Sequence, residues 1–140
     1  MSAESNKTII RRLFQMIQDG NSMNVEEIFA SNWVNHDPTL PPMQGFDGAR
    51  QLINMWSTSL SNRKVTIEDM VAEGERVAAR FTFSGTNTGP LMGIPPTGKT
   101  ANSTGIGIFR VVDGKLTENW VNFDALGMLQ QLGIIPAMGK

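Results

Sequence analysis

Apolar residues recur at helical spacing in the first half of the chain. Between Ser5 and Asp19 this spacing predicts an amphipathic helix that Ser5 caps and Gly20 ends. A short helix is expected near residues 25–30, and a longer one from about residue 47 to residue 60. The apolar stripes of the two longer helices are Ile9, Ile10, Leu13, Phe14, Met16 and Ile17 in the first, and Leu52, Ile53, Trp56 and Leu60 in the second.

The second half changes to the alternating pattern of strands. It predicts strands at 65–73, 76–86, 100–112 and 116–124, and then a short helix at 125–132 that Gly133 closes. Residues 32–38, NWVNHDP, are too few for a helix and end at a proline. Helices followed by consecutive strands are typical of an α+β domain with helices on one face of an antiparallel sheet. Without a repeat or a linker, residues 1–140 are expected to form a single domain.

A tight turn is predicted between the last two strands. Asp113 and Gly114 favour a type I′ turn, which requires positive φ at both central residues. A two-residue turn at this point fixes the pairing of the strands on either side. It sets Ser103 opposite Asp124, Gly105 opposite Asn122, and Gly107 opposite Trp120.

The last strand carries the residues with the clearest chemical potential. With a period of two, Trp120, Asn122 and Asp124 share one face, and the opposite glycines, Gly105 and Gly107, leave room beside the acid. This arrangement predicts the floor of a pocket. Candidates for its walls are Trp33, Trp56 and Met92, the last in the long glycine- and proline-rich connection 87–99, which is typical of a binding loop.

Composition narrows the classes of partner. The 140 residues are 40% hydrophobic and 18% charged with a net charge of −1, so the chain has no basic excess to attract nucleic acid. No apolar run reaches membrane-spanning length and the first residues lack a signal peptide, so the cytoplasm is the expected location. With no cysteine and a single histidine, His36, a structural metal is not expected.

Four segments in order resemble one family. They are GTNTGPLMGIPPTGK from Gly85, GIGIFRVVDGKL from Gly105, ENW with Asp124 four residues after the tryptophan, and LGMLQQLG from Leu126. Together they resemble the SnoaL-like polyketide cyclases, also called ester cyclases, of the nuclear transport factor 2-like superfamily. The resemblance implies a cone-shaped α+β barrel and a cofactor-free intramolecular aldol condensation of a hydrophobic small molecule. It also implies that Asp124 is the acid and base, which suits a reaction needing a base, enolate donors such as Asn122 or Trp120, and a dry site.

Two candidate catalytic residues have structural alternatives. Asp124 directly precedes the predicted last helix, where an aspartate commonly acts as an N-cap. His36 could shuttle a proton or donate to a substrate carbonyl, or it could be a buried residue bonded to the backbone.

Other functions on the same fold stay open. They are a small-molecule-binding module without chemistry, an isomerase and an epoxide hydrolase. The chain has no tyrosine for a ketosteroid-isomerase type of oxyanion hole, and no arginine is evident beside the predicted inward acids. An outer sheet face carrying Ile106, Ile108, Val121 and Phe123 predicts a homodimer.

Overall fold

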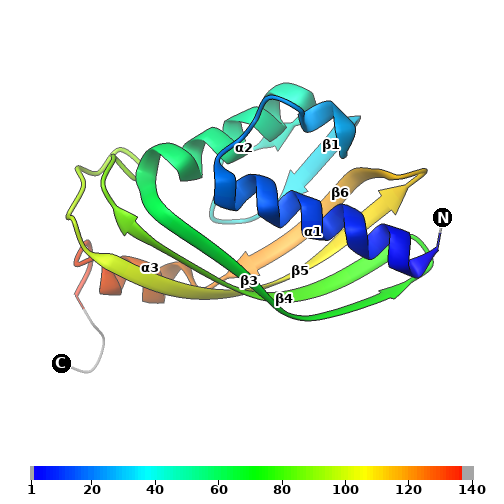
Figure 1. The fold of residues 1–140 in the computed structure, drawn as a ribbon. Coiled ribbons are helices and arrows are strands. Elements are labelled where there is room, and N and C mark those ends of the chain that lie inside the picture. Colours follow the sequence, from blue (N-terminus) through cyan, green and yellow to red (C-terminus); the bar gives the residue numbers. More distant parts are fainter. Residues whose placement is uncertain (1, 137–140) are drawn as a thin grey trace.

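Two helices lie across one face of a curved sheet in the computed structural model, which describes residues 2–136 (Figure 1). A third, short helix follows the last strand at one end of the sheet. In chain order the elements are α1 (Ala3–Asp19), the 3₁₀ turn η1 (Val25–Glu27), β1 (Phe29–His36), β2 (Met43–Gln44), α2 (Gly45–Ser59), β3 (Leu60–Glu73), β4 (Arg76–Asn87), β5 (Thr100–Val112), β6 (Lys115–Phe123) and α3 (Ala125–Gln131).

The α+β class is confirmed, and the sheet is mixed and open. Its strand order is β2-β1-β6-β5-β4-β3, and the β3 to β6 meander is antiparallel throughout. β1 joins this meander by pairing parallel to β6, with Asn35 opposite Asn119 and His36 opposite Trp120. The sheet was expected to be antiparallel, and the parallel pairing of β1 with β6 is the one departure from this. The sheet stays open, with β2 and β3 as its edges.

Local signals explain where the helices begin and end. The Ser2 hydroxyl accepts a hydrogen bond from the Ser5 amide at 3.0 Å, so α1 begins earlier than the predicted cap at Ser5. Gly20, at φ 71°, ends α1 in the left-handed conformation. The predicted helix at 25–30 shortens to η1, because the chain is already extended from Phe29 onward.

A β-bulge in β6 decides which residues face the helices. The predicted turn is confirmed by positive φ at Asp113 and Gly114, and Val111 pairs with Leu116 as expected. Thr117 is then an extra residue, and its hydroxyl donates to the Arg110 carbonyl at 3.1 Å. Beyond it the register shifts by one, and such a shift exchanges the two faces of a strand.

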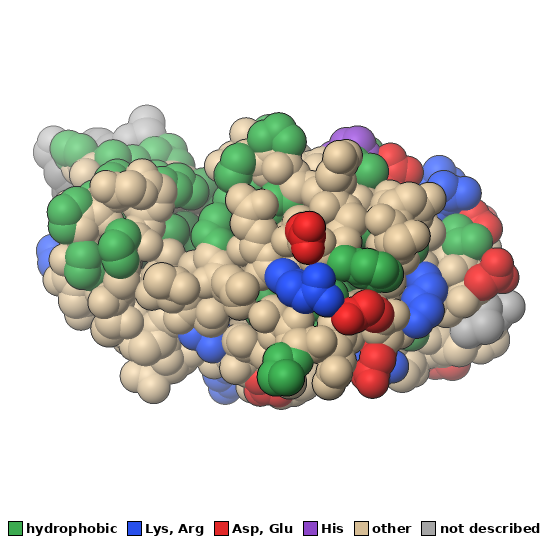
Figure 2. All heavy atoms as spheres, turned by 90° about the horizontal axis from the view of Figure 1, so that it is seen from above, with side chains coloured by type: hydrophobic (Ala, Val, Ile, Leu, Met, Phe, Trp, Pro, Cys, Tyr) green, Lys and Arg blue, Asp and Glu red, His purple; other side chains and the backbone are tan. Residues whose placement is uncertain are grey.

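The helical side of the molecule carries no segregated charge (Figure 2). Figure 2 shows acidic and basic side chains intermixed on the helical side of the molecule, in keeping with the net charge of −1. Within residues 2–136, no helix has both the length and the apolar character needed to cross a membrane.

Candidate active site

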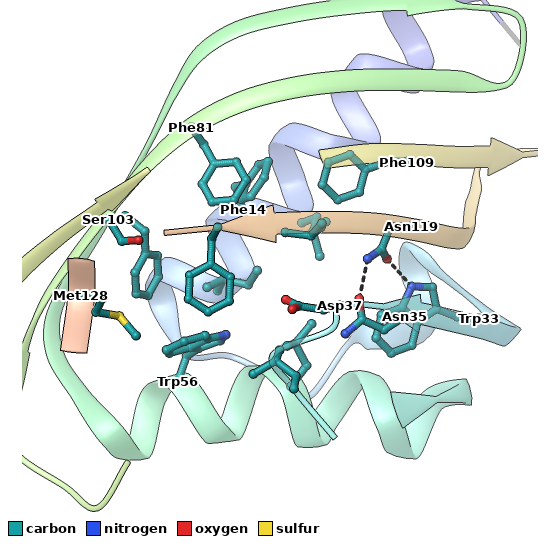
Figure 3. Close-up of a pocket in the computed structure, with 17 residues that line it drawn as sticks. Phe14, Trp33, Asn35, Asp37, Trp56, Phe81, Ser103, Phe109, Asn119 and Met128 are labelled. Carbon is teal, nitrogen blue, oxygen red and sulfur yellow. Dashed lines mark hydrogen bonds between the residues drawn. The ribbon is translucent and has the colours of Figure 1, made fainter. Parts of the chain in front are cut away.

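A small apolar cavity lies between the two long helices and the inner face of the sheet (Figure 3). Its volume is about 80 Å³. Aromatic rings form much of its wall. The lining residues are Leu13, Phe14, Ile17, Trp33, Asn35, Asp37, Leu40, Leu52, Trp56, Phe81, Phe83, Ser103, Phe109, Asn119, Val121, Phe123 and Met128.

A carboxylate and two amides interrupt this apolar lining. Asn35 and Asp37 come from the inner face of β1 and the residue just after it, and Asn119 faces Asn35 from β6. Figure 3 shows the Asp37 carboxylate pointing into the cavity near the Asn35 amide. Among the lining residues that the structure describes, Asp37 is the only titratable one. This concentration of polar groups in an apolar cavity is typical of a reactive site.

The carboxylate of Asp37 is held in place by its own turn. Its Oδ1 accepts hydrogen bonds from the Thr39 amide at 3.0 Å and from the Thr39 hydroxyl at 2.7 Å. Pro38 lies between them and fixes the backbone of the turn. Since Oδ1 carries both bonds, Oδ2 is the oxygen available to take a proton from a bound molecule.

The amides form a short chain of hydrogen bonds. The Trp33 indole Nε1 donates to Asn119 Oδ1 at 2.6 Å, and Asn119 Nδ2 donates to Asn35 Oδ1 at 2.6 Å. Trp33 and Asn119 are almost wholly buried, at 0% and 3% exposure. The chain thus satisfies two buried polar side chains and connects them to the cavity.

Two of the predicted wall residues, Trp33 and Trp56, line the cavity. The Trp56 ring packs against Phe83 and edge-on against Phe123, with centroids 5.3 Å and 5.9 Å apart. Met92 is 48% exposed on the connection between β4 and β5 and does not reach the cavity.

The predicted glycines face inward, but the space beside them is filled. A Cβ at Gly105 would lie 2.5 Å from the Phe81 ring, and one at Gly107 would lie 2.9 Å from the Phe109 ring and 3.0 Å from Val121. Both positions are buried. On the inner side the glycines therefore make room for aromatic side chains of the cavity wall. On the outer side they border, with Asp124, an open hollow on the sheet surface.

The predicted inward face of the last strand was wrong. Past the bulge at Thr117, the side chains of Trp120, Asn122 and Asp124 face outward, where they border an open hollow on the outer face of the sheet. Asp124 Oδ1 accepts a hydrogen bond from the Gly127 amide at 2.9 Å and so caps α3. The structural role that the sequence left open for Asp124 is therefore present.

His36 also lies on the outer side of the sheet. Its Nε2 is 2.7 Å from Glu118 Oε2, and its ring stacks on Trp120 with an interplanar angle of 12°. The alternation along β1 explains this placement, because Asn35 and Asp37 point inward on either side of it. In the part of the chain that the structure describes, no three His, Asp or Glu side chains come together to hold a metal ion.

The cap gives a prediction about stability. Replacing Asp124 with Ala should lower the free energy of unfolding by about 0.5–2 kcal/mol, since the Gly127 amide loses its acceptor. Replacing it with Asn should change stability little, because asparagine caps a helix about as well. Chemical denaturation of both variants measures the difference. Equal losses for Ala and Asn would show that the side-chain acceptor contributes nothing.

Known proteins are similar to this one in both sequence and fold. Residues 7–132 match the family model of the SnoaL-like polyketide cyclases. The chain is 27% identical over 132 residues to the aklanonic acid methyl ester cyclase DauD of Streptomyces sp. (strain C5), covering 89% of this chain and 80% of that protein. It is also 27% identical to the aklanonic acid methyl ester cyclase DnrD of Streptomyces peucetius, covering 89% and 88%.

A solved structure has the same fold. TsrD from Streptomyces laurentii superposes with a TM-score of 0.87 at 27% identity, over 96% of this chain and 99% of that one. The family match covers most of α1 and all of α2, α3, the sheet and the polar groups of the cavity. The chain belongs to the SnoaL-like polyketide cyclase family.

Proposed function

We propose that this protein closes a ring in a keto ester or polyketide by a cofactor-independent intramolecular aldol reaction, with Asp37 as the base. The observation that carries the proposal is a single carboxylate, with a free Oδ2, beside two amides in a largely apolar cavity. A carboxylate placed in such a cavity can take a proton from a molecule bound there. The cyclase names of the relatives support the reaction class.

The reaction needs only proton transfers and one new bond. Asp37 takes a proton from the carbon that lies between the ketone and the ester, and the resulting enolate carbon attacks a second carbonyl carbon of the same molecule. A carbon–carbon bond forms, the attacked carbonyl becomes an alkoxide, and the proton held by Asp37 passes to that oxygen. Substrate and product are isomers of equal mass, so no redox partner is consumed.

The enolate needs a hydrogen-bond donor, and Asn35 supports that part of the proposal. Its Oδ1 is occupied by Asn119, and its Nδ2 points into the cavity (Figure 3). Donors preorganised toward a developing oxyanion are usually a large contribution to catalysis in dry sites. Asp37 and Asn35 together would supply a base and an oxyanion donor from adjacent inward positions of one strand end.

The cavity limits what fits beside these groups. Pockets that enclose drug-sized ligands measure roughly 300–1,000 Å³, whereas this cavity measures about 80 Å³. We infer that it encloses the reacting segment of the substrate, and that a larger substrate requires the aromatic wall to move. Phe14 and Phe81, with ring centroids 4.9 Å apart, are the pair whose displacement would enlarge it.

The proposal is tested with an aromatic β-keto ester that carries a second ketone within ring-closing reach. We expect the purified protein, without added metal or nucleotide, to convert it to an isomer of equal mass. Liquid chromatography separates the two isomers and mass spectrometry confirms their mass. Binding of the compound, detected by tryptophan fluorescence, without any conversion across a series of such esters would favour the non-catalytic binding module.

We also propose a homodimer that forms through the outer face of the sheet. Ile106, Ile108 and Trp120 are exposed there at 59%, 43% and 38%. The other two residues predicted for this face, Val121 and Phe123, line the cavity instead, because the bulge turns them inward. Apolar side chains gathered on one open face favour a partner surface.

Sedimentation should therefore give a dimer at micromolar concentration, and Ile106→Lys should shift it to a monomer. Met23→Lys is the matched control, since Met23 is 80% exposed between α1 and η1, away from the outer face of the sheet. A monomeric wild-type protein, or equal effects of the two lysines, would contradict the proposed interface.

A further inference from the structure

The direction of the hydrogen-bond chain from Trp33 to Asn35 is fixed by chemistry. An indole N–H can only donate, so the atom of Asn119 that faces Trp33 must be its oxygen. The Asn119 amide nitrogen then faces Asn35 and must meet an acceptor, so Asn35 presents its oxygen to Asn119. Its NH₂ group is left for the cavity, as Figure 3 shows.

Burial keeps the hydrogen bonds between Trp33, Asn119 and Asn35 from reversing their direction. Trp33 is fully buried and Asn119 is 3% exposed, so neither can exchange its partner for bulk water. If Asn35 turned over, its NH₂ would meet the NH₂ of Asn119 and both would lose their bond. A buried donor without an acceptor is strongly unfavourable. The indole of Trp33 therefore determines, through two hydrogen bonds, the orientation of the Asn35 amide.

We propose that Asn119 is a positioning residue that holds the donor side of Asn35 toward the substrate, and that Trp33 sets its polarity. This inference rests on the proposed function. It makes the site selective for a substrate with an oxygen acceptor next to its acidic carbon, because the reversed amide would present a lone pair to the enolate and repel it. The selectivity then depends on the buried pair Trp33 and Asn119 as well as on Asn35, which presents the donor.

The sharpest test is Asn119→Asp. The carboxylate can still accept from Trp33, but it can only accept from Asn35 as well, so Asn35 must turn its NH₂ toward residue 119 and its oxygen toward the cavity. We expect kcat to fall by about 10²–10³-fold, as on losing an oxyanion donor, with KM changed by only a few-fold. Asn35→Leu should lose a similar factor.

The double variant separates a positioning role from an independent one. If Asn119 acts through Asn35, adding Asn119→Asp to Asn35→Leu should cause no further loss, whereas independent roles should multiply the two losses. Multiplied losses, or an Asn119→Asp variant with wild-type kcat, would overturn the inference. If the carboxylate prevents folding, Trp33→Phe removes the indole donor that sets the polarity, at the cost of a small cavity in the core. An unchanged kcat in that variant would overturn the inference equally.

A measurement without substrate keeps this inference distinct from the proposed function. In the wild type, the side-chain NH₂ of Asn119 should be protected from hydrogen exchange and that of Asn35 should exchange quickly, as followed by nuclear magnetic resonance. In Asn119→Asp the Asn35 NH₂ should become protected. If Asp37→Asn lost activity but the Asn35 NH₂ stayed unprotected in Asn119→Asp, the proposed cyclase function would hold and the positioning role would be refuted.

Discussion

Replacing Asp37 with Asn should lower kcat for an intramolecular aldol closure by about 10²–10⁴-fold, the usual contribution of a positioned general base. The variant retains an oxygen that can accept the two hydrogen bonds from Thr39, so the turn and the fold should persist. It lacks the group that takes the proton. Steady-state kinetics on the β-keto ester, with a denaturation curve for the same preparation, would give both quantities.

Asp124→Asn is the matched control for this substitution. It makes the same chemical change on the outer side of the sheet and keeps the oxygen that caps α3. We expect its turnover to stay within a few-fold of the wild type. The opposite pattern, a large loss in Asp124→Asn and none in Asp37→Asn, would transfer the role of base to Asp124 and require the end of β6 to turn inward in the complex.

Much of the fold could be predicted because its signals are local. The apolar period and Gly20 give α1, the alternation over Thr100–Val112 gives β5 with the expected bounds, and positive φ at Asp113 and Gly114 follows from their residue types. The parallel pairing of β1 with β6 joins segments far apart in the sequence, and no periodicity within either segment encodes it.

The site was harder to predict because one residue reverses a face. The register expected from the turn holds at Val111 and Leu116, and then the bulge at Thr117 shifts it. Nothing in the sequence around Thr117 distinguishes a bulged threonine from an ordinary strand residue. Every inference about the inner face beyond that point was displaced by one position, so Phe123 and Val121 lie opposite Gly105 and Gly107, where Asn122 and Trp120 were expected.

A usable signal for Asp37 was nevertheless present. Trp33, Asn35 and Asp37 alternate along one segment, and a strand with the buried Trp33 on its inner face places the other two there as well. The proline at the end of NWVNHDP instead favours a loop at this point. The single histidine between them was the more familiar catalytic residue type, yet the same alternation that brings Asp37 inward directs His36 outward.

The second large effect concerns the size of the substrate. Phe81 lies opposite Gly105 across β4 and β5, and its ring occupies the space that a side chain at 105 would need. Phe81→Leu should enlarge the cavity, and Gly105→Ala should push the ring into it. Each change should lower the free energy of unfolding, by about 0.5–3 kcal/mol for the first and about 1–3 kcal/mol for the second.

Their effects on specificity should be opposite in sign. Phe81→Leu should raise the ratio of kcat/KM for a bulky keto ester to that for a small one by about 10-fold or more, because a difference of one methylene in an apolar pocket is worth roughly 10–200-fold. Gly105→Ala should lower the same ratio, while Thr104→Ala, at the adjacent exposed position outside the cavity, should leave it unchanged. Competition between the two esters in one reaction measures the ratio directly. If all three variants kept the wild-type ratio, the substrate would not contact the Phe81 wall, and the reacting segment would have to bind elsewhere.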